Sequence, residues 1–245
     1  MAATLDMPSL GKFYRRQLLE DVLPFWFPRA YDEKNGGLYH CFDADGTLVD
    51  SNGVWVEIDN GFLARRGLTP TREYSDTVGH SIFPIAAQFT KDYYCLDMTP
   101  EAIMAEWLDM ARDAYARQVP MKPGAEAFLA RCAAAGEPMA LLTACVPELC
   151  RAALARHRLE GYFRQIIFVQ ELGLEKRNPE AFTRSLALLG AEAGDCTLFE
   201  DSPGACRAAQ AVGIRAVGVF DPFYASYEAE MRGFCDRYIT SFTEL

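Results

Sequence analysis

The segment from residue 139 to residue 220 contains four apolar stretches: MALLT (139–143), QIIFV (165–169), CTLFE (196–200) and RAVGVF (215–220). Helical patterns lie before and between them, at residues 124–135, 147–158, 179–189 and 204–212. Repeated strand–helix units of this length are typical of a parallel β-sheet with helices on both faces. Stretches such as LLT and IIFV lack polar alternation, as expected of strands buried on both faces. We therefore predict a doubly wound, Rossmann-like α/β fold.

A fifth strand is expected earlier, at residues 38–42 (LYHCF), and residues 54–119 have mainly helical patterns. Thr99, Pro100 and Glu101 provide a capping hydroxyl, a proline at the first helical position and an acid in the first turn. We therefore predict a helical domain inserted after the first strand. The expected organisation is an N-terminal helical extension (1–36), an α/β core (37–53 and 120–245) and an α-helical cap (54–119).

The composition excludes several classes of protein. Of 245 residues, 50% are hydrophobic and 24% are charged, which is ordinary for a globular chain with a core. The formal net charge is −10, which argues against a nucleic-acid partner or an anionic membrane surface. No apolar run reaches the ~18 residues that a membrane-spanning helix needs. We expect a small-molecule partner and either a monomer or a homodimer.

The chain contains eight cysteines, none of them in a C-x-x-C pair. The first residues do not combine a basic segment with an apolar one, so they do not resemble a secretory signal. Unpaired thiols in a chain without such a signal are typical of a reducing compartment. We therefore expect a cytoplasmic protein with reduced cysteines.

Reactive side chains collect where the predicted strands end, which is where α/β sheets bind their ligands. The first strand leads into Asp43-Ala44-Asp45-Gly46-Thr47-Leu48, the second ends at Thr143, a later loop contains Lys176, and another strand leads into Glu200-Asp201-Ser202. Phosphoryl transfer through a carboxylate requires such a set. One acid attacks phosphorus, a second handles protons, a hydroxyl and an ammonium hold phosphate oxygens, and further acids hold Mg²⁺.

These blocks resemble the four motifs of the haloacid dehalogenase-like superfamily, over about residues 38–245. The opening DADGTL, followed by Asp50-Ser51, and the block FEDSPGAC at 199–206 are the most specific parts. Phosphatases of this superfamily have a helical cap inserted after the first motif, where the helical insert is predicted here. The third motif often reads K-P-x-P, whereas residues 176–179 read KRNP. Lys176 and Pro179 keep their spacing, so we expect the lysine to keep its role.

The resemblance implies a role for each motif residue. Asp43 would be the nucleophile and Asp45 the general acid/base, while Thr143 and Lys176 would bind phosphate. Mg²⁺ would be held by Asp43, Glu200 and Asp201 together with the backbone carbonyl of Asp45. Gly46 would permit the tight turn after the first strand. The residues expected to contact the substrate are Thr47, Ala144, Ser202 and, from the cap, His80.

Residues 10–50 also resemble the start of the N-acylglucosamine 2-epimerases, through LPFW (23–26) and DEKNGG (32–37) leading into D-x-D-G. That family folds as a helical barrel of several hundred residues, so this short segment implies no epimerase activity. The similarity suggests a fusion joined within residues 43–50. It makes the first strand weak, because two glycines and His40 are unusual in or beside a central strand.

The sequence therefore predicts a Mg²⁺-dependent phosphatase that hydrolyses a small phosphorylated metabolite, such as a sugar phosphate, through an aspartyl-phosphate. Two alternatives stay open. One is a phosphotransferase of the β-phosphoglucomutase type, which would return the phosphoryl group to a sugar. The other is a non-catalytic fusion product, which the weak first strand suggests.

Overall fold

The computed structural model describes residues 39–79, 81 and 83–245. Its centre is a six-stranded parallel sheet in the order β3-β2-β1-β4-β5-β6. The strands are β1 (Tyr39–Phe42), β2 (Met139–Thr143), β3 (Gln165–Phe168), β4 (Cys196–Glu200), β5 (Arg215–Val219) and β6 (Arg237–Ile239). The predicted doubly wound α/β fold is confirmed. The N-terminal extension lies outside the described residues.

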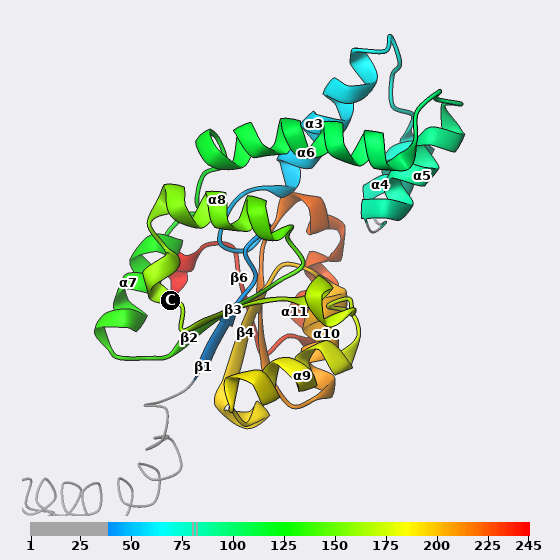
Figure 1. Cartoon of the computed structure of the whole chain (residues 1–245). Helices are drawn as coiled ribbons and strands as arrows, with labels where there is room; N and C mark the ends of the chain where they lie inside the picture. Colours follow the sequence, from blue (N-terminus) through cyan, green and yellow to red (C-terminus); the bar gives the residue numbers. More distant parts are fainter. Residues whose placement is uncertain (1–38, 80, 82) are drawn as a thin grey trace, which may run out of the picture.

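Helices cover both faces of the sheet (Figure 1). On one face lie α7 (Ala125–Ala134) and α8 (Pro147–His157), and on the other lie α9 (Pro179–Leu189), α10 (Pro203–Ala211) and α11 (Glu228–Phe234). Successive residues of β2 point to the two faces. Leu141 packs in the cluster with α7 and α8, whereas Leu142 packs in the cluster with α9 and α10. Short 3₁₀ helices complete this part of the chain: η2 (Glu160–Tyr162), η3 (Val169–Leu172), η4 (Ala193–Asp195), η5 (Pro222–Tyr227) and η6 (Phe242–Glu244).

The first strand lies inside the sheet despite its unusual sequence. β1 pairs with β2 on one side and with β4 on the other. His40 is accommodated because its Nε2 is 2.9 Å from Oε2 of Glu137, and its ring lies 5.7 Å from that of Phe199. The observation that suggested a non-catalytic fusion product, a doubtful first strand, is thereby removed.

Four helices follow β1 and lie beyond the end of the sheet at which its strands terminate (Figure 1). They are α3 (Asn52–Ala64), α4 (Arg72–Gly79), α5 (Phe83–Tyr93) and α6 (Pro100–Arg117). Thr99 caps α6 as its sequence indicates, and its side chain accepts from the amide of Ala102 at 3.2 Å. α6 packs against α3 and α5 and also against α8. We call α3–α6 the helical layer. No helix among the described residues is long and apolar enough to cross a membrane.

Candidate active site

The loop after β1 is built tightly around Asp43. The amide of Asp43 donates to the carbonyl of Phe199 in β4 at 3.2 Å, and the amide of Ala44 donates to Oδ1 of Asp43 at 2.7 Å. Gly46 has a φ of 72°, and a Cβ at this position would lie 2.3 Å from Oδ2 of Asp201. Glycine is therefore required here for both the backbone conformation and the close approach of an acid.

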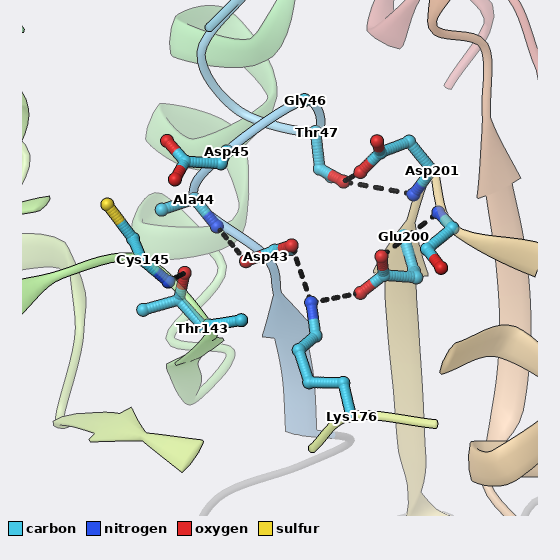
Figure 2. A network of polar contacts seen from close by, with 12 residues as sticks. Asp43, Ala44, Asp45, Gly46, Thr47, Thr143, Cys145, Lys176, Glu200 and Asp201 are labelled. Atoms are coloured by element: carbon cyan, nitrogen blue, oxygen red, sulfur yellow. Dashed lines mark hydrogen bonds and ion pairs between the residues drawn. The ribbon is translucent and has the colours of Figure 1, made fainter. Parts of the chain in front are cut away.

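Three carboxylates and one ammonium meet where β1 and β4 end (Figure 2). Carboxylate oxygens of Asp43, Glu200 and Asp201 lie within 4.8 Å of one another. Nζ of Lys176 lies 2.5 Å from Oδ2 of Asp43 and also forms an ion pair with Oε2 of Glu200. All four side chains are buried. We call these four residues the charged cluster.

The electrostatics of the charged cluster favour an additional cation. Burial raises the pKa of Glu200 to about 8 and that of Asp201 to about 7, and the charge of Asp43 adds to both shifts. Burial alone would lower the pKa of Lys176, but the charges of Asp43 and Glu200 outweigh it and hold this pKa above its ordinary value. One ammonium cannot offset the charge of all three acids once they are deprotonated. Hard divalent cations prefer oxygen ligands of this kind, so the donor set fits such an ion.

Asp201 is fixed by two residues of the loop and first helix that follow β1. Oγ1 of Thr47 donates to Oδ1 of Asp201 at 2.7 Å and accepts from the amide of Asp201 at 3.1 Å. Nδ2 of Asn52, the first residue of α3, donates to Oδ2 of Asp201 at 3.0 Å. Thr47 is fully buried, so the structure shows its hydroxyl as a partner of Asp201. The substrate contact expected of Thr47 stays a prediction.

Asp45 belongs to a separate hydrogen-bond network that reaches the helical layer. Its Oδ1 accepts from Oγ of Ser51 and from Oη of Tyr115, both at 2.9 Å. Nε1 of Trp55 donates to the same Tyr115 oxygen at 3.0 Å. Burial raises the pKa of Asp45, and the charge of Asp43 raises it further. A carboxyl with a raised pKa is suited to carry a proton in catalysis.

The contact of Tyr115 with Asp45 could not be predicted from the sequence. Tyr115 belongs to the apolar face of α6 and is fully buried, which is how the sequence pattern presents it. Helical spacing identifies a buried face but not the partner that a hydroxyl on that face reaches. The distance of 70 residues between Tyr115 and Asp45 left no signal in the sequence.

The other predicted site residues lie around the same strand ends. Thr143 ends β2, is fully buried, and its Oγ1 accepts from the amide of Cys145 at 3.1 Å. The carbonyl of Ala144 accepts from Nε2 of Gln170 at 2.9 Å. Ser202 precedes α10, and its amide donates to Oε1 of Glu200 at 3.0 Å. His80 lies outside the described residues.

A cavity of about 400 Å³ adjoins Asp45, between the strand ends and the helical layer. Its walls come from α3, α4, α5 and α6 on one side and from the loops after β2 and β5 on the other. Aromatic and aliphatic side chains form most of its surface. Its lining includes Asp45, Asn52, Trp55, Asp59, Asn60, Phe83, Trp107, Phe223 and Tyr224. Cavities of this size and character hold small molecules.

The profile of the haloacid dehalogenase-like hydrolases matches residues 41–219, which include the whole charged cluster and Asp45 but not η5 or β6. The chain belongs to this family. Among curated relatives of this hydrolase, protein CbbY of Cupriavidus necator is 29% identical over 200 residues, covering 72% of this chain and 75% of the relative. Hexitol phosphatase A of Escherichia coli is 27% identical over 183 residues, covering 74% and 82%.

A solved structure shows the same fold. CbbY from Rhodobacter sphaeroides, determined in complex with phosphate, is similar to this hydrolase with a TM-score of 0.72 and 21% sequence identity. The superposition covers 84% of this chain and 95% of the CbbY chain. The family assignment and the fold therefore agree with the expectation from the sequence motifs.

Proposed function

We propose that this hydrolase is a phosphatase that cleaves a small phosphate monoester through an aspartyl-phosphate on Asp43. The observation that carries the proposal is the charged cluster, in which the Asp43 carboxylate faces one buried ammonium and two further buried acids. The named relatives support it, because one is a hexitol phosphatase and the CbbY structure contains phosphate.

Mg²⁺ is the cation that we assign to the charged cluster. Asp43, Glu200 and Asp201 would hold it, together with the carbonyl of Asp45, and oxygen ligands of this kind are those that Mg²⁺ prefers. When bound, Mg²⁺ would offset the negative charge of the acids and of the phosphoryl group.

The reaction uses two aspartates in two steps. An Oδ of Asp43 attacks phosphorus, the bond to the leaving oxygen breaks, and Asp45 donates its proton to that oxygen. Asp45 then takes a proton from a water molecule that attacks the same phosphorus, which releases inorganic phosphate and restores the Asp43 carboxylate. The raised pKa of Asp45 suits the first step, in which this group must begin protonated.

The remaining residues orient the phosphoryl group. Lys176 and Thr143 would bind its oxygens, and Ala144 and Ser202 lie at neighbouring strand ends, where they would contact the substrate. Thr47 would act through Asp201, which it holds by two hydrogen bonds. A substrate contact by His80 stays a prediction. The helices α3–α6 would serve as the cap that excludes bulk water and contributes specificity.

The proposal is tested by phosphate release from p-nitrophenyl phosphate with Mg²⁺. Asp43→Asn keeps the shape of the side chain but removes the nucleophile, so kcat is expected to fall by about 10³-fold or more. Asp109→Asn is the matched control, because Asp109 lies on α6 with its side chain 71% exposed. Equal rates for Asp43→Asn and the wild type, with both proteins folded by circular dichroism, would overturn the proposal.

A further inference from the structure

One wall of the cavity beside Asp45 is made of aromatic rings from the helical layer, which pack edge to face or tilted against one another. The ring of Phe83 lies 5.6 Å from that of Trp55 and 5.6 Å from that of Trp107. All three residues line the cavity, and they come from α5, α3 and α6. The three rings therefore form one continuous aromatic surface.

The opposite wall adds a second aromatic pair. Phe223 and Tyr224 belong to η5, after β5, and their rings meet edge to face at 5.0 Å. Both line the cavity. Burial raises the pKa of Tyr224 to about 12, so its phenol is uncharged at neutral pH. A flat ligand would therefore meet aromatic surfaces from both the helical layer and the sheet side.

The charges in the cavity are all negative among the described residues. Asp45 and Asp59 are its charged lining residues, and the described part of the lining includes no lysine, arginine or histidine. Arg66, which follows α3, is engaged elsewhere, because it pairs with Glu106 at 2.6 Å and stacks on Phe62. A second phosphate or a carboxylate on the leaving group would thus meet carboxylates and aromatic rings without a cation.

One polar group in the cavity remains able to bind a ligand. Asp59 accepts from Oη of Tyr74 at 2.7 Å through one oxygen, and a carboxylate has further acceptor capacity. The cavity can therefore bind a ring that carries a donor on its edge.

We propose that the alcohol released by this hydrolase is uncharged and carries a flat ring with hydrogen-bonding groups, as a nucleoside does. The inference rests on the proposed phosphatase function and adds a substrate class to it. Aromatic surfaces on both walls favour stacking of the ring. The charged groups of the described lining are acids, which disfavours leaving groups that bear an additional anion, as bisphosphates and phosphorylated acids do.

Two matched pairs of substrates test the two parts of this proposal. Uridine 5′-monophosphate and ribose 5-phosphate differ by the ring, and we expect the nucleotide to have a kcat/KM about tenfold higher or more. Fructose 1-phosphate and fructose 1,6-bisphosphate differ by a second phosphate, and we expect the bisphosphate to have a kcat/KM about tenfold lower or more. A ratio near one, or reversed, in either pair would overturn the corresponding part.

Substitution of Asn60 tests whether charge sets the preference for fructose 1-phosphate over the bisphosphate. Asn60 is an exposed residue on α3 that lines the cavity. Asn60→Lys would supply a cation, so the disadvantage of the bisphosphate should shrink about tenfold. Asn60→Gln separates side-chain size from charge and should keep the wild-type ratio. An unchanged ratio in Asn60→Lys would show that missing positive charge does not set the preference.

A binding measurement separates this proposal from the proposed function. Uridine and ribose are titrated into the wild type while the fluorescence of Trp55 and Trp107 is followed. We expect uridine to quench this fluorescence at a concentration at least about tenfold lower than ribose does, and Trp107→Phe to weaken uridine binding. If none of the phosphates is hydrolysed but uridine binds in this way, the phosphatase proposal fails and the ligand class holds. If phosphates are hydrolysed and uridine does not bind, the ligand class fails.

Discussion

The two ends of the site differ in how they are built. The charged cluster consists of Asp43, Lys176, Glu200 and Asp201, which come from strand ends and one loop. Lys176 forms ion pairs with Asp43 and Glu200, and hydrogen bonds hold Asp201. The cavity end is formed largely by helices, and its described residues are aromatic, aliphatic and neutral polar groups with two acids. In the proposed reaction, the first end would stabilise the phosphoryl group, whereas the second would discriminate between leaving groups. The proposal therefore assigns chemistry and specificity to different parts of the chain.

Among the variants that test this comparison, Gly46→Ala should have the largest effect on the charged cluster. The added Cβ would lie 2.3 Å from Oδ2 of Asp201 and 2.4 Å from Nδ2 of Asn52, at a φ that alanine rarely adopts. We expect a loss of about 1–3 kcal/mol in the free energy of unfolding, measured in urea, together with at least about a tenfold loss of kcat/KM. Gly53→Ala is the control, because a Cβ at Gly53 in α3 meets nothing within 4 Å. Equal behaviour of the two variants would contradict this account of the loop.

The pH dependence of stability tests whether burial raises the pKa values of the acids in the charged cluster as the structure indicates. In the folded protein the pKa of Glu200 is about 8 and that of Asp201 about 7, whereas the ordinary pKa values of these groups are 4.5 and 3.8. The folded state therefore binds more protons than the unfolded state between about pH 4 and pH 8, and stability falls as the pH rises through this window.

Thermal denaturation measures this effect. Without divalent cations, Tm should fall by a few °C, on the order of 2–4 °C per kcal/mol lost, between pH 5 and pH 8. Added Mg²⁺ should raise Tm more at pH 8 than at pH 5, because the ion binds deprotonated carboxylates. A Mg²⁺ effect that is equal at the two pH values would show that these acids do not titrate in this range.

Tyr115 lies between Asp45 and the aromatic wall of the cavity, so Tyr115→Phe tests how the two ends of the site are connected. Its effect on kcat should be smaller than that of Gly46→Ala on kcat/KM. Its hydroxyl donates to Asp45 and accepts from Trp55. A hydrogen bond to the charged form of Asp45 lowers the pKa of that group, so its loss should move the pH profile of kcat to higher pH. We expect kcat to fall by roughly three- to tenfold, as for one hydrogen bond. Tyr94→Phe is the control, because its hydroxyl donates to the exposed carbonyl of Thr69. A lower kcat with an unshifted pH profile would indicate a purely structural role.

Much of the fold could be predicted because the strands and their helices are locally encoded. The predicted bounds of β2, β4 and α9 agree with the structure to the residue, since apolar runs and a proline after a capping asparagine mark them. β6 was missed, because three residues are too few for a recognisable pattern. The doubtful β1 is stabilised by Glu137, which lies 97 residues from His40 in the chain.

The site residues also divide into those that topology predicts and those that helix packing brings to the site. The acids and the lysine follow strand ends, so their convergence could be expected from topology alone. The partners of Asp45 and the aromatic walls of the cavity depend on how helices pack against one another. Tyr115 and Trp107 lie on the buried face of α6, and hydrophobic spacing cannot distinguish a core contact from a contact with the site.

The most direct test of the central claim is to trap the phosphoryl group on the enzyme. Asp45→Asn should slow hydrolysis of the intermediate, while p-nitrophenyl phosphate, which needs little help from an acid, still phosphorylates the protein. After an acid quench, we predict a hydroxylamine-sensitive phosphate on the peptide that contains Asp43, and none in the Asp43→Asn, Asp45→Asn double variant. Phosphate on a different residue, or continued turnover by the double variant, would contradict the account.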